Sequence, residues 1–410
     1  MNELMEDMTL VGGEIVQEPL EGRMILNVGP QHPSTHGVLR LIVTLEGERV
    51  IDVMPDVGFL HTGIEKEAES KTYNKTITFT DRMSYLTPLN NELAFMLAVE
   101  KLMDIDVPKR AQYIRVLLCE LDRLASHLVW LGTTALELGA MSVMLYCFRE
   151  RESILDIMEM VSGARMMASY FRVGGLAWEL PDDFDQAVTR FLTDFPDRLA
   201  EYEALLTNNP IWLERTKGVG VIDAETALSL GLSGPPLRAS GVDWDLRRDM
   251  PYSSYDEFEF DVAVAQEGDV YARYAVRLEE MRQSVRIVWQ ALEKVRETAG
   301  QPIRTSNRKV TPPPREELDT SMESLIHHFK LWTEGFKPPV GEVYAAVEAA
   351  RGELGFYIVS DGSGKPYRWH MRGPSFVNLQ SIGPMARGGL IADLIAIVAS
   401  VDPVMGEVDR

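Results

Sequence analysis

Two histidines stand in a segment whose composition is typical of a rigid loop. Residues 29–37 read Gly-Pro-Gln-His-Pro-Ser-Thr-His-Gly, with His32 and His36 four residues apart. On a helix this spacing would place both imidazoles on one face, as a metal pair requires, but Pro33 disfavours helical backbone at His32. The prolines and glycines instead favour a fixed presentation of the imidazoles. From residue types alone, a functional role and a structural role of this loop both remain open.

Glu137 is the second residue with a chemical consequence. It ends the apolar part of a predicted helix, within Ala-Leu-Glu-Leu-Gly-Ala at 135–140. A carboxylate buried alone costs several kcal/mol, so it must be paired or protonated. Residue types favour a buried ion pair, and they leave open a carboxylate that tunes the pKa of a histidine.

Two further patterns resemble functional motifs without meeting their requirements. Residues 362–365 read Gly-Ser-Gly-Lys, but a phosphate-binding loop needs glycine where Val359 stands and Ser or Thr where Pro366 stands. We therefore predict a turn between strands. His327 and His328 fall on a predicted helix about 100° apart, so they cannot chelate one metal together, and we expect a packing or surface role.

Composition excludes several classes of protein. The chain has 410 residues, 41 basic and 62 acidic side chains, and a net charge of −21, which argues against direct nucleic-acid binding. Cys119 and Cys147 are the only cysteines, so this chain alone cannot hold a four-cysteine iron–sulfur cluster or a zinc ribbon. The longest apolar run, 389–401, is short and contains Asp393, and the N-terminus has no signal-peptide pattern. We expect a cytoplasmic chain without a transmembrane segment.

Helices are expected to dominate the middle of the chain. One helical face collects the apolar residues between 114 and 131, and a second clear helix runs from 274 to 295. Thr320 and Glu323 predict a capping box for a later helix, and a last helix is expected at about 390–400. Period-two patterns predict strands at both ends of the chain, at 24–28, 38–45, 49–53, 343–348, 356–359 and 367–371.

These elements predict an α+β fold, a central long-helix bundle flanked by small N-terminal and C-terminal β-sheets. We expect four regions. Residues 1–22, with six acidic and no basic side chains, form a flexible tail or a partner-wrapping arm. Residues 23–60 form an N-terminal β region with the histidine loop, 61–338 the helical core, and 339–410 a C-terminal mixed region.

Several long strings resemble one known family. They are 29–40, Thr-Asp-Arg-Met-Ser-Tyr at 80–85, TSMESLIHHFKLWTEG at 320–335, the turn 357–367 and DPVMGEVDR at 402–410. All resemble the 49-kilodalton subunit of proton-pumping NADH:quinone oxidoreductase, respiratory complex I. The resemblance runs from about residue 23 to residue 410, and only the acidic tail lies outside it.

That family is similar in fold to the large subunit of nickel–iron hydrogenases, whose cysteine pairs hold metals. One such pair follows an Asp-Pro near the C-terminus, whereas Asp402-Pro403 is followed here by Val404 and Glu407. An alkyl group cannot replace a thiolate ligand. The resemblance therefore implies a lost metal site, no cofactor bound by this chain alone, and a cavity that takes a quinone headgroup. A small partner subunit would carry the 4Fe–4S cluster that delivers electrons.

The resemblance also implies roles for five residues. His36 and Tyr85 would hydrogen-bond the two quinone carbonyls and supply protons, and Glu137, where the family usually has Asp, would pair with His36. Arg82 would lie close to the partner's cluster, and Val404 would form an apolar wall of the quinone channel. The structural alternatives are a buried aromatic for Tyr85, a surface salt bridge for Arg82 and core packing for Val404.

One position departs from the family. Many members carry a histidine near the partner's cluster, whereas Met167 stands at the matching place. A thioether cannot titrate, so we predict that the cluster's potential depends weakly on pH in this complex.

The expected function is thus that of a peripheral-arm subunit, active only in the assembled complex, on the cytoplasmic face of the inner membrane. Its expected partners are the cluster-bearing subunit, the other peripheral-arm subunits and the membrane-arm subunits. Two alternatives remain, a hydrogenase-type large subunit that binds nickel and a scaffold without a quinone site. The sequence does not distinguish ubiquinone from menaquinone, or identify the electron-donor module.

Overall fold

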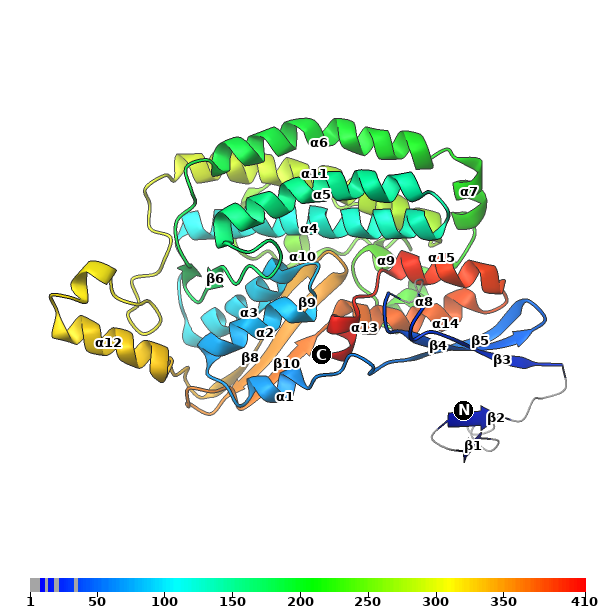
Figure 1. The fold of residues 1–410 in the computed structure, drawn as a ribbon. Helices are drawn as coiled ribbons and strands as arrows, with labels where there is room; N and C mark the ends of the chain where they lie inside the picture. Colours follow the sequence, from blue (N-terminus) through cyan, green and yellow to red (C-terminus); the bar gives the residue numbers. More distant parts are fainter. Residues whose placement is uncertain (1–7, 12–13, 18–21, 33–35) are drawn as a thin grey trace.

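The computed structural model describes residues 8–11, 14–17, 22–32 and 36–410. Its architecture is α+β, with long helices in the middle of the chain and short antiparallel sheets toward both ends, as the sequence predicts (Figure 1). The arm expected at 1–22 lies largely outside the described residues. Within it, β1 (Met8–Val11) and β2 (Glu14–Gln17) form an antiparallel pair.

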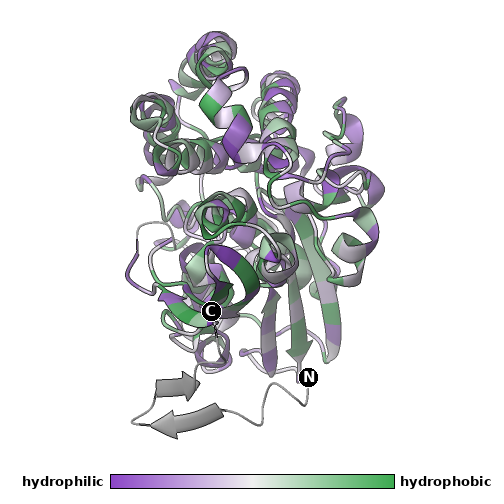
Figure 2. Ribbon diagram, turned by 90° about the vertical axis from the view of Figure 1, so that its right-hand side faces the viewer, coloured by the Kyte–Doolittle hydropathy of each residue, from purple (hydrophilic) through white to green (hydrophobic). Residues whose placement is uncertain are grey.

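Four long helices form one layer of the molecule (Figure 1). The central helix α4 packs against α5 and α11, and α6 also packs against α5 and α11. Figure 2 shows these helices nearly end-on above the strands. Their bounds are α4 (Lys109–Glu137), α5 (Met141–Ser162), α6 (Phe184–Leu206) and α11 (Val270–Glu297).

A three-stranded antiparallel sheet with β9 in its middle forms a second layer. One side of α3 packs on this sheet and the other on α4, so α3 joins the sheet to the bundle, with α2 beside it. The bounds of these elements are α2 (Tyr73–Met83), α3 (Pro88–Met103), β8 (Gly341–Ala349), β9 (Gly352–Ser360) and β10 (Arg368–Arg372).

The N-terminal sheet has β4 in its middle, and α14 packs on β5 at its edge. Alternate residues of β4 are buried, namely Leu41, Val43 and Leu45, so the period-two pattern identified its core face. Behind α14, α15 packs on α4 and α11 and so links this sheet to the bundle. The bounds are β3 (Met24–Val28), β4 (Arg40–Glu46), β5 (Arg49–Asp56), α14 (Ile382–Ala386) and α15 (Ile391–Val401).

Shorter elements connect these layers. They are α1 (Ile64–Ala68), β6 (Phe171–Arg172), β7 (Gly175–Leu176), α7 (Pro210–Thr216), α8 (Ala224–Ser229), α9 (Pro235–Arg238), α10 (Leu246–Asp249), the 3-10 helix η2 (Tyr255–Glu257), η3 (Arg315–Glu317), α12 (Met322–Thr333), α13 (Pro374–Asn378), η4 (Leu379–Ser381) and α16 (Met405–Asp409).

The core of the bundle is charged as well as apolar. Glu280 of α11 binds the guanidinium of Arg238 and lies 2.8 Å from Nε2 of His127, all three being almost fully buried. Glu120 and Arg123 of α4 form a second buried pair. An amphipathic helix pattern predicts only the apolar face of α4, but its polar face is buried too because α10 and α11 bring ionic partners to it, Arg247 to Glu120 and Glu280 to His127.

Most predicted elements are confirmed to within a few residues at each end. The capping box is wrong in detail, because Ser321, and not Thr320, caps α12 by accepting the backbone N–H of Ser324. The Gly-Ser-Gly-Lys segment connects β9 to β10, as predicted. His327 and His328 lie on α12, where His327 Nε2 is 2.6 Å from the carbonyl of Arg308 and His328 packs on Trp332.

Candidate functional site

His36 follows the end of the gap at 33–35 and precedes β4. Its backbone is left-handed, with φ 50°, and Gly37 beside it has φ 107°. The imidazole is half-buried, and no described residue hydrogen-bonds its buried Nε2 atom. Burial lowers the pKa of His36, the charge of Asp402 raises it, and that of Arg351 lowers it further. The ring is therefore held largely neutral, with an inward-facing nitrogen available to a ligand.

Tyr85 lies in the corner between α2 and α3. Its ring packs against α16, where a Cβ atom built on Gly406 would lie 3.2 Å from Tyr85 Cε1 and 2.6 Å from the carbonyl oxygen of Met83. Only glycine at 406 therefore allows this close approach. Burial raises the pKa of Tyr85, Arg351 lowers it, and Asp402 and Glu407 raise it again. The phenol stays protonated at neutral pH and can donate a hydrogen bond.

The same two charges thus act on His36 and Tyr85. Arg351 lies in the turn between β8 and β9, and its Nη2 is 3.0 Å from Oδ2 of Asp402, while its Nε donates to the Asp402 carbonyl at 2.9 Å. Both side chains are almost fully buried. Three segments far apart in sequence, carrying His36, Tyr85 and Asp402, therefore converge on one ion pair.

The C-terminal segment is held firmly beside this ion pair. The carboxylate of Glu407 accepts the backbone N–H of Ser375 at 2.6 Å, and the Val404 N–H donates to the Ser375 hydroxyl at 3.3 Å. Val404 is 2% exposed. Asp409 accepts the backbone N–H groups of Gly58 and Leu60 at 2.9 and 2.6 Å, which ties the end of the chain to the segment after β5.

Glu137 is the last residue of α4 and is half-buried. The expected ion pair is not formed: no described cation lies within salt-bridge distance of Glu137, and its Oε2 atom has no hydrogen-bond partner there. Burial alone raises its pKa to about 7. The protonatable alternative fits this environment. Among the described residues, the charges that shift the pKa of His36 belong to Asp402 and Arg351, so pairing of Glu137 with His36 stays a prediction.

Arg82 lies on α2, and Met167 lies on the segment after α5. Arg82 is exposed, donates to the Thr78 carbonyl at 2.6 Å, and makes no salt bridge to any described carboxylate. The surface salt bridge considered from sequence is thus absent there. Met167 is half-buried, two residues before Ser169, whose hydroxyl donates to Asp81 of α2 at 2.7 Å.

The space beside Tyr85 is small in this chain. A cavity of about 10 Å³ borders Tyr85, with Leu86, Met158 and Met166 among its walls. That volume is about that of one water molecule, so a ring-sized ligand beside Tyr85 needs a further wall or a shift of these side chains.

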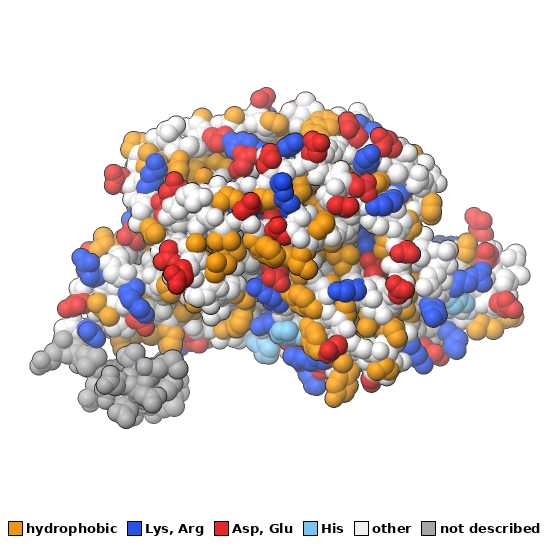
Figure 3. Space-filling view, turned by 180° about the vertical axis from the view of Figure 1, so that it is seen from behind, with side chains coloured by type: hydrophobic (Ala, Val, Ile, Leu, Met, Phe, Trp, Pro, Cys, Tyr) orange, Lys and Arg blue, Asp and Glu red, His pale blue; other side chains and the backbone are white. Residues whose placement is uncertain are grey.

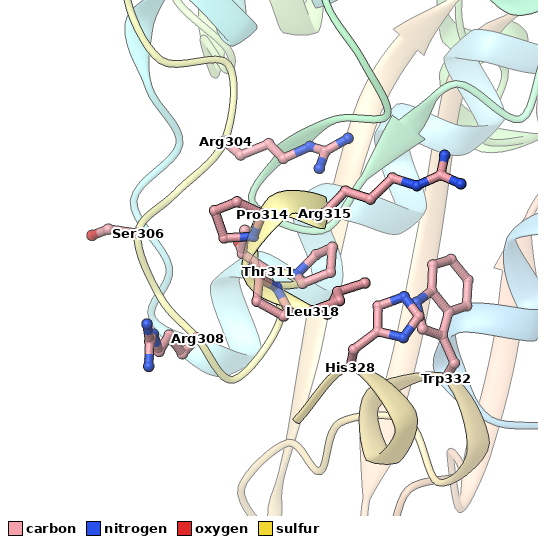
Figure 4. Close-up of a pocket in the computed structure, with 11 residues that line it drawn as sticks. Arg304, Ser306, Arg308, Thr311, Pro314, Arg315, Leu318, His328 and Trp332 are labelled. Atoms are coloured by element: carbon pink, nitrogen blue, oxygen red, sulfur yellow. The ribbon is translucent and has the colours of Figure 1, made fainter. Parts of the chain in front are cut away.

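The larger cavities lie away from His36 and Tyr85. One of about 780 Å³ is lined by three arginines and a proline-rich turn, and Figure 4 shows Arg304 and Arg315 extended toward the same side while Arg308 points away. A neighbouring cavity of about 450 Å³ shares Arg304 and Trp332 with it and reaches Thr78, next to Arg82. None of the residues predicted for the site lines either cavity.

Residues 8–11, 14–17, 22–32 and 36–410 contain no signal for a metal centre or a membrane span. No group of three or more His, Cys, Asp or Glu side chains there is arranged to hold a metal ion. Nor does any helix of this part of the chain have the length and apolar character to span a bilayer. Acidic, basic and apolar side chains are interspersed on the face shown in Figure 3.

Sequence reasoning missed Arg351 altogether and gave Asp402 no role. Nothing in the local pattern marks Arg351, which lies 51 positions from Asp402. A signal for Asp402 did exist, since Asp-Pro before an apolar residue stands out at 402–404. The resemblance drew attention to Val404 and Glu407, whereas Asp402 is the carboxylate whose charge acts on both His36 and Tyr85.

Comparison with known proteins identifies the family of the chain. The family model described as "Respiratory-chain NADH dehydrogenase, 49 Kd subunit" matches residues 137–410. The chain is 62% identical over 400 residues to an NADH-quinone oxidoreductase subunit of Chloroflexus aurantiacus, covering 97% of each chain. It is 64% identical over 400 residues to the corresponding subunit of Roseiflexus castenholzii, covering 97% of this chain and 96% of that one. It is 57% identical over 387 residues to that of Geotalea uraniireducens, covering 94% and 98%. The chain therefore belongs to the 49-kilodalton subunit family of respiratory complex I, and is a peripheral-arm component of that oxidoreductase.

Proposed function

We propose that this subunit forms one wall of the quinone-reduction site, with His36 and Tyr85 as hydrogen-bond donors to the two carbonyl oxygens of the headgroup. The observation that carries the proposal is their shared dependence on the buried Arg351–Asp402 pair. Two donors from distant segments, set against one fixed pair of charges, suit a ligand with two acceptor oxygens.

The pKa shifts support separate roles for the two donors. Tyr85, whose pKa burial raises, keeps its proton and can donate a hydrogen bond throughout the neutral range. Burial favours the neutral form of His36, and Asp402 opposes that effect. Negative charge that develops on a quinone oxygen during reduction acts in the same direction as Asp402, so the imidazole gains a proton-donating form when reduction needs it.

We propose that Glu137 responds to proton donation by His36 during quinone reduction. With a pKa raised to about 7 by burial, it can gain or lose a proton near neutral pH without leaving its place. In the proposed cycle Glu137 pairs with protonated His36. When His36 gives its proton to the reduced quinone, the ion pair is lost, and the freed carboxylate signals toward the proton-pumping subunits.

Cys119 and Cys147 are buried and lie on different helices, α4 and α5, so they cannot hold an iron–sulfur cluster. Electrons must therefore come from another subunit. We propose that a neighbouring 4Fe–4S protein binds the face that carries Arg82, whose guanidinium has no carboxylate partner among the described residues and would stabilise the reduced cluster. The same neighbour would supply the wall that the small space beside Tyr85 lacks. Val404 and the region 339–410 would line the quinone channel, with the assembly at the cytoplasmic face of the inner membrane.

The experiment is quinone reduction by the assembled complex carrying Tyr85→Phe or His36→Asn. Loss of a buried hydrogen bond costs about 1–3 kcal/mol, so each variant is expected to lower the rate by about five- to 150-fold. Tyr367→Phe is the matched control, because Tyr367 is 70% exposed. If both site variants assemble and reduce quinone as fast as Tyr367→Phe, the subunit is a scaffold and the proposal fails.

A further inference from the structure

The corner between α2 and α3 carries both Arg82 and Tyr85, so its geometry decides where these two side chains lie. Asn91 of α3 donates from Nδ2 to the carbonyls of Thr80 and Ser84, at 2.9 and 3.1 Å. The amide of Asn91 therefore ties the first turn of α3 to the last turn of α2. Its partners are backbone atoms, which do not change with pH.

A second link between these helices consists of two acids. Asp81 of α2 and Glu92 of α3 are both 0% exposed. Oδ2 of Asp81 accepts the Ser169 hydroxyl at 2.7 Å, and Oε2 of Glu92 accepts the Phe171 N–H at 2.7 Å. The other oxygen of each group, Asp81 Oδ1 and Glu92 Oε1, is buried and receives no hydrogen bond from a described donor. The two carboxyl groups lie within hydrogen-bond reach of each other.

Two ionised carboxylates offer only acceptors, so they repel one another where they meet. A single proton between Oδ1 and Oε1 turns this contact into a hydrogen bond and satisfies both orphaned oxygens at once. Because both groups are buried, the alternative of leaving each oxygen unpaired costs the full desolvation of that oxygen without a hydrogen bond in return. Geometry and hydrogen-bond supply thus point to the same protonation state.

The charged neighbours do not supply the missing donor. Arg82 of α2 donates to the Thr78 carbonyl, and Arg172 of β6 donates to the carbonyls of Ser169 and Phe171. From α4, Asp122 and Cys119 face the same region, and neither adds positive charge. Asp122 is itself satisfied by the backbone N–H groups of Leu89 and Asn90.

We propose that Asp81 and Glu92 bind one proton between them, and that this proton-sharing pair positions Arg82 and Tyr85 by holding α2 against α3. The pair does not touch the quinone; both residues are positioning residues. Their effect on quinone reduction rests on the proposed function of Tyr85, whereas the shared proton does not.

The direction of the pKa shifts is consistent with the geometry. Burial raises the pKa of both acids, and the charge of Asp81 raises that of Glu92 further. An acid with a raised pKa binds its proton more tightly in the folded chain than in the unfolded one. Its stabilising contribution is therefore present at low pH and is lost as the pH rises through the folded-state pKa. Deprotonation at alkaline pH leaves two adjacent anions and loosens the corner.

Infrared spectroscopy of the assembled complex tests the shared proton. Protonated carboxyl groups have a carbonyl stretch that carboxylates and amides lack, and that shifts in heavy water. We expect Asp81→Asn and Glu92→Gln each to remove the same band, because an amide can donate to the remaining carboxylate. Asp122→Asn is the control, since it removes another buried acid with a raised pKa and must leave this band in place.

A kinetic measurement on the same variants tests the positioning role. Glu92→Gln keeps a hydrogen bond without a proton that can be lost, so it should retain the rate at acidic pH and move the alkaline fall in quinone reduction upward by about one pH unit or more. An alkaline fall that stays in place overturns the positioning role. A band that survives in either variant overturns proton sharing, and that readout is independent of where the quinone binds.

Discussion

Arg351 and Asp402 form a buried salt bridge, with Nη2 and Oδ2 3.0 Å apart, to which both His36 and Tyr85 are electrostatically coupled. Asp402 ends α15 with left-handed backbone, φ 56°, and a second bond from Arg351 Nε fixes its carbonyl. These contacts restrict the conformations of both side chains. The Asp402 side chain therefore lies at a fixed place relative to the two proposed proton donors.

Asp402→Asn should lower the pKa of His36, because it removes a charge that raises this pKa. The protonated fraction of His36 at any given pH then falls, so the alkaline fall of the pH–rate profile of quinone reduction should move to lower pH by about one unit. Asp393→Asn, on α15, is the control, since Asp393 forms a partly exposed salt bridge with Arg215. Identical profiles for the two variants would contradict the coupling.

Glu137→Gln should lower the rate of quinone reduction by much more than tenfold, because it removes a group that titrates near neutral pH. Glu137→Asp, the residue usual in the family, should retain most of the rate since the carboxylate remains. The measurement is turnover of assembled complexes at neutral pH. Near-normal turnover of Glu137→Gln would remove Glu137 from the mechanism.

Met167→His should make the midpoint potential of the neighbouring cluster pH-dependent. In the native complex, Met167 cannot take up a proton when the cluster is reduced, so a weak dependence is expected. A titrating histidine coupled to reduction should bring the slope toward about 59 mV per pH unit, the one-electron, one-proton value. Redox titration followed by electron paramagnetic resonance measures both. A full slope in the native complex would show that another group has this role.

Glu280→Gln should lower the free energy of unfolding by about 1.5–3 kcal/mol, because it removes one of the two carboxylates that bind the buried Arg238 guanidinium, the other being Glu348. Burial alone would raise the pKa of Glu280, but Arg238 and His127 hold it well below its usual range. The stabilisation is thus present at neutral pH and is lost as the pH falls toward the folded-state pKa.

Glu279→Gln on the adjacent, half-exposed position should cost less than about 1 kcal/mol, since its pair with Arg282 is open to solvent. Chemical denaturation of the full chain compares the two variants. Equal losses would mean that the buried network is not the stabilising feature.

Periodicity predicted the local elements well and the ionic core poorly. The apolar positions of α11 and the alternation in β4 report burial of one face, which is a local property of the sequence. Burial of Glu120 and Arg123 depends on partners from other elements, among them Arg247 of α10 and Glu348 of β8. No local pattern contains that information, so the polar face of α4 was not recognised as core.

The site shows the same limit. The residue strings identified His36, Tyr85 and the terminus as a set, through resemblance to a family. The Arg351–Asp402 pair became visible only when the turn between β8 and β9 and the end of α15 were placed together. The Asp81–Glu92 contact likewise requires the packing of α2 on α3, which is a tertiary and not a periodic property.

A density map of the assembled peripheral arm with bound quinone tests the central claim most directly. We expect a headgroup with one carbonyl oxygen in hydrogen-bond contact with the His36 imidazole and the other with the Tyr85 hydroxyl. A headgroup that occupies its site away from both rings would contradict it.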